Sequence, residues 1–394
     1  MLGGSAARPR SDVTLENWQT VPQLRWSFQH IEELFPTALI SRGSGPVAGF
    51  EEQLEPLGDV TVEHPDGTES TVSQIIAATD TDGWIVVHHG RVLAESYPDG
   101  MAAETRHLLM SVSKSLVGTV AGALIASGEL DPTRPLAEYV PALGKSGYDG
   151  ATVRNLLDMR SGIRFSEDYL NPGAEVRLIE QAIGWAPRQH AGVPPTMYDF
   201  LVTLQQQRPH GGPFEYRSCE TDVLGWICEE ATGVRMPELM SRLLWSRLGA
   251  ESDAAIAVDS AGAAMFDGGL CTTLRDLARF GTMLVQRGQS MTGEHIVPEW
   301  WIEDSLRGDP DSRQAFADSP TVSLMPGGMY RNQFWLPFPD RNVLLCLGIH
   351  GQMVYANCDT GIVGAKLSSW PEPQNATKLF SALRAFDTIS ALRA

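Results

Sequence analysis

The chain has 394 residues, of which 43% are hydrophobic and 20% charged, which is the composition of an ordinary globular protein with enough chain to bury a large core. Asp and Glu outnumber Lys and Arg by 48 to 30, giving a formal net charge of −18, which argues against a nucleic-acid or anionic-membrane partner because both require a basic surface. The five cysteines, an odd number without a Cys-x-x-Cys pair, indicate reduced thiols rather than a disulfide framework or a zinc site.

The N-terminal part of the chain carries no recognisable targeting segment. Its first residues lack the apolar stretch of a secretory signal. The longest apolar run, Leu116 to Ala126, is interrupted by glycines and is shorter than the roughly 20 residues that a membrane span needs. We therefore expect a cytoplasmic protein without a membrane partner. Residues 1–75 are rich in proline, glycine and charge, and we expect an N-terminal extension with one or two short helices that wraps the core.

A β-hairpin is predicted directly after this extension. Two runs rich in β-branched and aromatic residues, 84–87 and 92–97, flank a turn at Gly90. Two further strands are predicted near the C-terminus, at 343–349 and 361–367. Strands from both ends of the chain can therefore join one sheet.

Helices are predicted between these groups of strands. Leu116, Val120 and Leu124 lie on one helical face, and Gly128 supplies a helix stop. Further helices are predicted over residues 236–244, over residues 273–284 and in the tail from about residue 375.

This order of elements predicts an α+β fold. An antiparallel sheet from both chain ends is flanked by helices, and a mainly α-helical region is inserted into it. We expect residues 76–394 to form a single domain, with an α/β part at about 76–110 and 285–394 and a mainly helical part at about 111–284.

The segment 107–118, predicted to open the first long helix, carries a pair of residues suited to nucleophilic catalysis. Ser111 and Lys114 are three positions apart, so they lie on one helical face about a turn from each other. Ser111 would sit at the positive end of the helix dipole, which favours a developing alkoxide. A serine hydroxyl needs a neighbouring base, and lysine can serve only if burial lowers its pKa well below about 10.4. The chain has only four lysines, and one inside an apolar helix start is unusual for a solvated face.

A tyrosine elsewhere in the chain could complete a proton relay. Tyr216 precedes an amphipathic segment that contains Val223 and Ile227. A phenol brought to Ser111 could pass protons to the leaving group, with Lys114 holding it as a phenolate or sharing its proton. Taken alone, a tyrosine packed in the core with its hydroxyl satisfied is the alternative interpretation.

The predicted strand at 346–352 is rich in glycine, where a substrate could approach the strand edge. A backbone N–H there, together with that of Ser111, would form an oxyanion hole, and each such donor typically contributes roughly 10²–10³ in rate. A glycine in a strand can instead mark a bulge.

Together these segments resemble the serine β-lactamase and penicillin-binding protein superfamily, in its class C β-lactamase-like branch. The likeness spans roughly residues 15–390 and includes the landmarks 130–136, 152–162 and 268–279. Within that branch the chain is similar to the nylon-oligomer hydrolases and related carboxylesterases. The segments that carry this similarity are Arg106–Ser115, Glu167–Tyr169, Gly184–Trp185, Gly348–Gln352 and Lys366–Pro371.

The resemblance implies the catalytic residues position by position. Ser111 is the acylated nucleophile, Lys114 its base partner, and Tyr216 the general acid/base. The N–H groups of Ser111 and Ile349 form the oxyanion hole, or Gln352 replaces Ile349 in another register of the strand.

The resemblance also implies a substrate-binding set. Tyr169 closes over the scissile group, Trp185 forms a cleft wall, and Glu180 meets a substrate ammonium. The other predicted substrate-binding residues are Asp267, Ser218 and His350.

Two family motifs differ in this chain. Tyr216–Ser218 replaces Tyr-x-Asn, and Cys346–Gly348, or in another register Ile349–Gly351, replaces Lys-Thr-Gly. The cation that grips the carboxylate of a β-lactam is missing, so we expect no lactamase activity. A carboxylate at position 267 near Lys114 would favour the protonated lysine unless it points toward the substrate.

We expect a serine hydrolase that forms an acyl-enzyme with short-chain carboxylic esters and with linear amides such as 6-aminohexanoate oligomers. With Glu180 and Asp267 in the cleft, amine-bearing or neutral substrates should be preferred to those with a carboxylate near the scissile bond. The expected partner is a small-molecule ester or amide, with no cofactor, metal or nucleic acid, and a homodimer remains open. The alternatives are a D-amino-acid peptidase or amidase of the penicillin-binding-protein type and a non-catalytic binding protein on the same fold.

Overall fold

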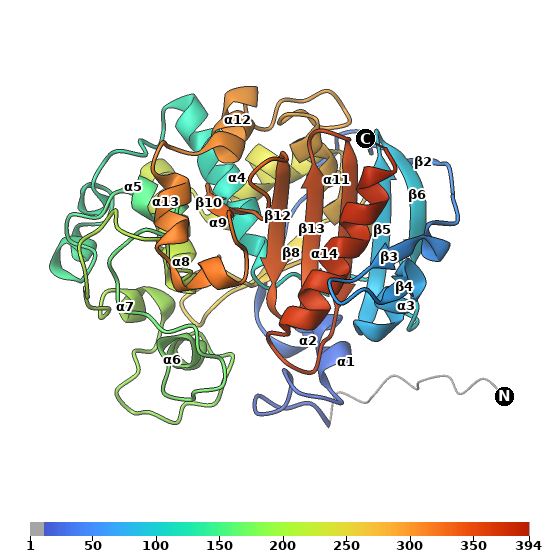
Figure 1. Cartoon of the computed structure of the whole chain (residues 1–394). Helices are drawn as coiled ribbons and strands as arrows, with labels where there is room; N and C mark the ends of the chain where they lie inside the picture. The colour runs from blue at the N-terminus through green and yellow to red at the C-terminus, as the bar shows by residue number, and fades with distance from the viewer. Residues whose placement is uncertain (1–11, 394) are drawn as a thin grey trace.

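The structure, a computed structural model, describes residues 12–393, and its centre is an eight-stranded sheet (Figure 1). Neighbouring strands are antiparallel, except that β2 lies parallel to β6 at one edge. Strands from the two chain ends meet where β14 pairs with β5. In spatial order the strands are β10 (Met329–Arg331), β11 (Phe334–Leu336), β12 (Val343–Gly348), β13 (Gln352–Asn357), β14 (Ile362–Ser368), β5 (Thr81–His88), β6 (Arg91–Ser96) and β2 (Glu51–Glu52).

Helices cover both faces of this sheet. On one face, α11 (Leu274–Val285) lies against β14, where Gly281 meets the Val363 side chain. On the other face, α14 (Ala376–Ala391) crosses the sheet, and its Phe386 packs on Gly364, in front of the strands in Figure 1. Neighbouring residues of β14 thus face opposite layers, as the alternation of a strand requires.

A mainly helical region lies beside the sheet (Figure 1). Its centre is α4 (Val112–Ser127), which is buried on nearly every side and packs against α8 (Ser218–Thr232). The surrounding helices are α5 (Val153–Leu157), α6 (Glu175–Ala182), α7 (Met197–Leu201), α9 (Met236–Met240), α10 (Ser246–Leu248), α12 (Glu299–Arg307) and α13 (Ser312–Ala317).

A small four-stranded antiparallel sheet joins the N-terminal part of the chain to the helical region. Its β7 pairs with β9, so the residues just before Ser111 lie beside those just after Asp267. Its strands are β1 (Thr37–Ile40), β8 (Ala254–Ala257), β9 (Leu270–Thr272) and β7 (His107–Leu108). The remaining elements before the hairpin are α1 (Leu24–Phe28), α2 (Ile31–Leu34), β3 (Thr61–Glu63), β4 (Glu69–Thr71) and α3 (Val72–Ala78).

Several predicted elements are confirmed. The hairpin is β5–β6, with His89 and Gly90 at the turn in the left-handed region (φ 49° and 78°). The first long helix is α4, which ends at Gly128 with φ 79°. The helices predicted at 273–284 and in the tail are α11 and α14, capped by Thr273 and Asn375.

Three predictions differ from the structure. Residues 107–108 form strand β7 rather than the start of the long helix, because Met110 has φ 46° and interrupts helical geometry before Val112. Strand β13 was not predicted as a separate strand, since a turn at Ile349–Gly351 divides the glycine-rich run in two. The N-terminal extension contributes one strand each to the eight-stranded and four-stranded sheets and forms a two-stranded sheet of β3 and β4, in addition to short helices, and α3 continues across residue 75.

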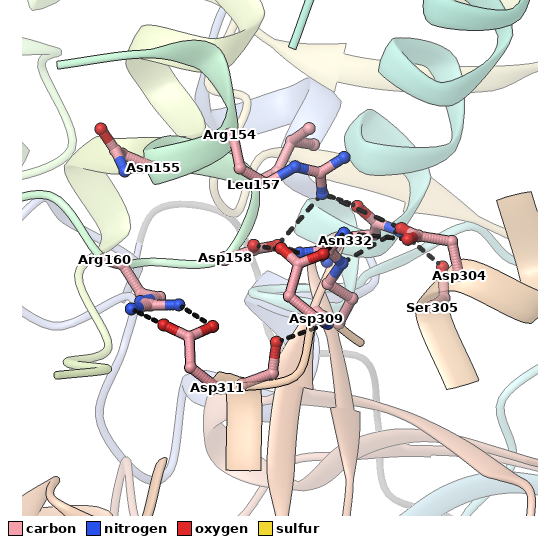
Figure 2. Close-up of polar contacts among 12 residues, drawn as sticks. Arg154, Asn155, Leu157, Asp158, Arg160, Asp304, Ser305, Asp309, Asp311 and Asn332 are labelled. Atoms are coloured by element: carbon pink, nitrogen blue, oxygen red, sulfur yellow. Dashed lines mark hydrogen bonds and ion pairs between the residues drawn. The ribbon is translucent and has the colours of Figure 1, made fainter. Parts of the chain in front are cut away.

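The turn between β10 and β11 is fixed by buried polar contacts. Asn332 accepts from Arg154 at 2.6 Å and donates to Asp304 at 2.8 Å, as Figure 2 shows. The next residue, Gln333, accepts from Ser115 of α4 at its carbonyl (2.7 Å) and from Thr221 of α8 at its side chain (2.8 Å). This turn therefore links the two helices between which the site lies.

Candidate active site

Ser111 is the N-cap of α4 and follows a strained residue. Met110 has φ 46°, in a region that a non-glycine residue rarely adopts. The strain is maintained by the small sheet on one side and the buried helix on the other. Ser111 remains 9% exposed at the positive end of the helix dipole, so its hydroxyl is accessible and a negative charge there is favoured.

Lys114 lies one turn further along α4 and is 1% exposed. Its Nζ donates to the Ser111 hydroxyl at 2.9 Å, to the Ser218 hydroxyl at 3.1 Å and to the Asp267 carbonyl at 2.8 Å. An ammonium group has three donors, and here each of them has an oxygen acceptor. The geometry therefore suits a charged lysine.

The charges around Lys114 favour the same state. Burial lowers the pKa of Lys114, but interactions with Tyr216 and with Asp267, whose Oδ2 lies 3.7 Å from Nζ, raise this pKa above its ordinary value. The surroundings of Lys114 thus raise its pKa, whereas a lysine that acts as the base by itself needs a lowered pKa.

Tyr216 lies beside both groups, in the loop that leads into α8. Lys114 Nζ is 5.3 Å from the centre of its ring, and the ring stacks on Trp335 at 5.2 Å. Burial raises the pKa of Tyr216 above its ordinary value, and the charge of Lys114 and hydrogen bonding with the Ser111 hydroxyl oppose this only in part. The structure therefore brings together the hydroxyl, the amine and the phenol that the sequence analysis singled out.

Two buried acids near this group were not predicted. Glu167 accepts from the Tyr169 hydroxyl at 2.7 Å and from the Ser218 backbone N–H, and burial raises its pKa. Asp222 accepts from the Asp267 backbone N–H at 3.1 Å, and burial raises its pKa well above the ordinary range. The sequence gives little indication of their role, because a single acidic residue does not show which distant segment it will contact in the fold.

The end of β12 approaches the nucleophile closely. A Cβ on Gly348 would lie 2.6 Å from the Leu109 carbonyl, so only glycine allows the strand to reach this position. Ile349 follows directly and lines the same cavity as Ser111. Gln352 begins β13, and its side chain pairs with Ser368 at 2.7 and 3.0 Å. This arrangement favours Ile349 over Gln352 as the second oxyanion donor.

A cavity of about 40 Å³ opens onto Ser111. Most of its wall is apolar, and its two charged residues, Glu180 and Asp267, are both acids. Of the predicted substrate-binding residues, Tyr169, Trp185, Glu180 and Asp267 lie on it, whereas Ser218 lies behind it, on Lys114. The lining residues are Gln19, Met110, Ser111, Tyr169, Val176, Ile179, Glu180, Ile183, Trp185, Met265, Asp267, Gly268 and Ile349.

The N-terminal segment supplies one wall of this cavity. The Trp18 indole donates to the Trp185 carbonyl at 2.8 Å and packs edge-on against its ring, with the ring centres 5.0 Å apart. Gln19 lines the cavity and donates to Glu180 Oε1 at 3.2 Å. Sequence reasoning missed Gln19, since about 160 residues separate the two partners.

Glu180 is not a free carboxylate. The Arg177 Nη1 atom donates to both of its oxygens at 2.8 Å, and the two side chains form an i,i+3 pair on α6. Burial raises the pKa of Glu180, and Arg177 opposes that shift. The role predicted for Glu180, contact with a substrate ammonium, therefore requires a partner exchange.

His350 lies away from the cavity. Its ring is 1% exposed, packs edge-on against Phe28, and its Nδ1 lies 2.6 Å from the Trp370 carbonyl. The left-handed conformation of His350 (φ 59°) turns the side chain away from the side on which Ile349 faces Ser111.

A second, larger cavity of about 640 Å³ is lined by residues of α1 and of the segments 99–105 and 369–371. It contains none of Ser111, Lys114 or Tyr216, so it is not the candidate active site. Within residues 12–393, no cluster of His, Cys, Asp and Glu is suited to hold a metal ion, and no helix has the length and apolarity to cross a membrane.

Comparisons with known proteins identify the family and the fold of the chain. A family model described as Beta-lactamase matches residues 69–386. The 6-aminohexanoate-dimer hydrolase of Paenarthrobacter ureafaciens is 42% identical over 373 residues, covering 94% of this chain and 91% of that protein. The predicted β-lactamase and penicillin-binding-protein-like fold is thereby confirmed.

Solved structures share the same fold. A candidate 6-aminohexanoate-dimer hydrolase from Bacillus anthracis superposes with a TM-score of 0.89 at 26% identity, covering 98% of each chain. EstCE1, a hydrolase with promiscuous acyltransferase activity, gives a TM-score of 0.62 at 17% identity, covering 81% of this chain and 96% of that one. The second likeness supports the fold alone.

Proposed function

The chain belongs to the beta-lactamase family of serine hydrolases, and on that premise we propose that it hydrolyses linear amides of the 6-aminohexanoate type and short-chain carboxylic esters through an acyl-enzyme on Ser111. One observation carries the proposal: Tyr216, far along the chain from Ser111 and Lys114, lies beside both of them, at a cavity that Ser111 lines. The identity of 42% to a 6-aminohexanoate-dimer hydrolase supports the choice of substrate.

Acylation begins with proton transfer from the Ser111 hydroxyl. Burial raises the pKa of Tyr216 and the charge of Lys114 opposes this rise, so in the proposed mechanism Lys114 stays an ammonium and stabilises the phenolate that acts as the base. The phenolate then accepts the Ser111 proton as Oγ attacks the substrate carbonyl carbon. Lys114 stabilises the phenolate and the serine oxygen by its charge.

The tetrahedral intermediate places its negative oxygen at the N–H groups of Ser111 and Ile349. Tyr216, now protonated, returns its proton to the leaving alcohol or amine, and the carbon–heteroatom bond breaks. A water molecule then attacks the acyl-enzyme and gives a proton to the Tyr216 phenolate. As the bond from the acyl carbon to Ser111 Oγ breaks, Tyr216 returns that proton to Oγ, and the carboxylic acid leaves. Esters should react more readily than amides because an alkoxide leaves more easily than an unprotonated amine.

The lining of the cavity favours apolar groups and disfavours a carboxylate near the scissile bond. Its wall includes Val176, Ile179 and Met265, and neither lysine nor arginine lines it. The strand position that carries a lysine in β-lactamases holds Cys346 here, which is fully buried. We therefore propose that β-lactams are not substrates.

A panel of substrates tests the proposal. We expect wild-type protein to hydrolyse p-nitrophenyl esters with neutral and cationic chain ends, and the linear amide of 6-aminohexanoate more slowly, while Ser111→Ala is inactive. Faster turnover of an ester with an anionic end would contradict the predicted charge preference. Preference for D-amino-acid amides over all of these would favour the peptidase alternative. Failure of a fluorophosphonate to label Ser111 in the folded protein would favour a non-catalytic binding protein.

A further inference from the structure

Arg177 makes a set of contacts that reaches beyond its own helix. Its Nη1 donates to both oxygens of Glu180 at 2.8 Å, and its Nε donates to the Tyr169 carbonyl at 2.8 Å. Its guanidinium lies 5.5 Å from the centre of the Tyr169 ring. One side chain thus holds two of the residues that line the cavity.

Arg177 does not line the cavity itself. Its side chain is 23% exposed, whereas that of Glu180 is 12% exposed and faces the cavity. The carboxylate is therefore presented to a substrate while its counter-ion approaches from behind, with access to solvent.

A substrate ammonium that binds Glu180 would have to replace the Arg177 guanidinium. A buried carboxylate gains most of its stabilisation from one well-placed cation, and two cations beside it repel each other in a low-dielectric site. Exchange of Arg177 for an ammonium keeps the carboxylate paired, because Arg177 can turn toward solvent. A neutral chain end requires no exchange.

Asp267, the other charged residue of the cavity, is not available to bind a substrate ammonium. The Asp267 carboxylate lies 3.7 Å from Lys114 Nζ, and its carbonyl accepts from the same atom. Displacing Lys114 would dismantle the catalytic group, so a substrate cation is left with Glu180.

We propose that Arg177 is a specificity-determining residue that competes with the ammonium end of a substrate for Glu180, and so sets how well cationic substrates bind relative to neutral ones. The proposal rests on the proposed function, since it concerns binding at the same cavity. While Arg177 occupies Glu180, only the fraction of molecules with a displaced arginine binds the ammonium with full affinity.

A pair of esters of equal length tests this competition. p-Nitrophenyl 6-aminohexanoate and p-nitrophenyl heptanoate differ only in an ammonium against a methyl at the chain end. For Arg177→Met we expect KM to fall about tenfold for the ammonium ester and to change by less than about twofold for heptanoate. Because burial raises the pKa of Glu180 and Arg177 opposes this rise, KM is measured over a series of pH values and compared at the alkaline end, where the carboxylate is favoured.

Matched variants isolate the effect. Arg164→Gln removes the same charge from a side chain that is 65% exposed and paired with Glu175, and should leave both KM values unchanged. Arg177→Lys should keep most of the competition. In the background of Glu180→Gln, Arg177→Met should no longer change the ratio of the two KM values.

Two results would overturn the proposal. Equal changes of KM for both esters in Arg177→Met would show that Arg177 only supports the loop around Tyr169. A rise in KM for the ammonium ester would show that Arg177 assists binding of the cation. Failure of the proposed function is distinct, because the wild-type protein would then hydrolyse neither ester.

Discussion

Lys114 and Lys366 are both fully buried, yet their surroundings differ. Lys366, on β14, donates to the Thr79 carbonyl at 3.1 Å and to the Ser368 hydroxyl, and lies 5.4 Å from the centre of the Trp370 ring. Burial lowers its pKa to about 7, and the acids Asp80 and Asp82 oppose this only in part.

Lys114 shows the opposite shift. Burial again lowers the pKa, but Tyr216 and the acids around it, foremost Asp267, raise it above the ordinary value. Burial in the fold thus lowers the pKa of a lysine, and the phenol and acids around Lys114 reverse that shift. The comparison shows that the neighbouring groups, and not burial alone, decide the direction in which the pKa of a buried lysine moves.

The largest expected effect is a difference in activity between variants of the two buried lysines. Lys114→Met should lower kcat/KM about 10³-fold or more, because it removes the charge that stabilises the phenolate and the serine oxygen. Lys366→Met should change kcat/KM by less than about threefold, since the hydrogen-bond partners of Lys366, Thr79 and Ser368, lie outside the group around Ser111. Both values come from steady-state hydrolysis of p-nitrophenyl heptanoate. An equal loss of kcat/KM in the two variants would contradict the different roles assigned to the two lysines.

The next effect concerns the phenol. Tyr216→Phe should lower kcat/KM by about 10²–10³-fold, because the ring keeps its stacking on Trp335 while the proton acceptor is lost. Thermal unfolding of the variant, measured in parallel, should stay close to that of wild type. Retention of wild-type activity would assign the base to another group.

The buried Lys366 makes stability depend on pH. In the folded protein its pKa is about 7, whereas in the unfolded chain it is about 10.4. Between these values the unfolded state binds one more proton, so the free energy of unfolding contributed by this group rises with pH by about 1.4 kcal/mol per unit. Urea unfolding of wild type and Lys366→Met from about pH 7 to pH 9 measures the difference. Parallel curves would show that the buried amine stays charged.

The smallest effect concerns Asp267. Its carboxylate, 3.7 Å from Lys114 Nζ, helps to retain the proton of the Lys114–Tyr216 pair. Asp267→Asn should therefore shift the rising limb of the kcat/KM–pH profile by about one unit toward lower pH. Glu303→Gln, which removes an exposed acid from α12, should leave the profile unchanged. A shift to higher pH in Asp267→Asn would contradict this electrostatic role.

Much of the fold could be predicted because its signals are local. The β5–β6 hairpin, the stop at Gly128 and the cap at Thr273 each depend on a few neighbouring residues. The Ser111–Lys114 pair could be recognised for the same reason, since three positions on a helix bring two side chains to one face. The place of Tyr216 depended on the family resemblance rather than on spacing.

The rest of the site depends on contacts between distant segments. Gln19 meets Glu180 across the cavity, and Glu167 meets Ser218 at the start of α8. No local pattern marks such pairs. His350 was included in the predicted substrate-binding set, but a left-handed backbone directs its ring into the core. The Arg177–Glu180 pair could have been predicted from the i,i+3 spacing of the two residues on a helix. Its significance appears only once Glu180 is known to face the cavity.

The most direct test of the central claim is to locate the covalent intermediate. Wild-type protein is mixed with p-nitrophenyl heptanoate, quenched in acid during turnover, digested and mapped by tandem mass spectrometry. We predict one heptanoyl group on the hydroxyl of Ser111, and none at this position in Ser111→Ala. Hydrolysis that proceeds with Ser111 unmodified, or with the acyl group on another residue, would contradict the claim.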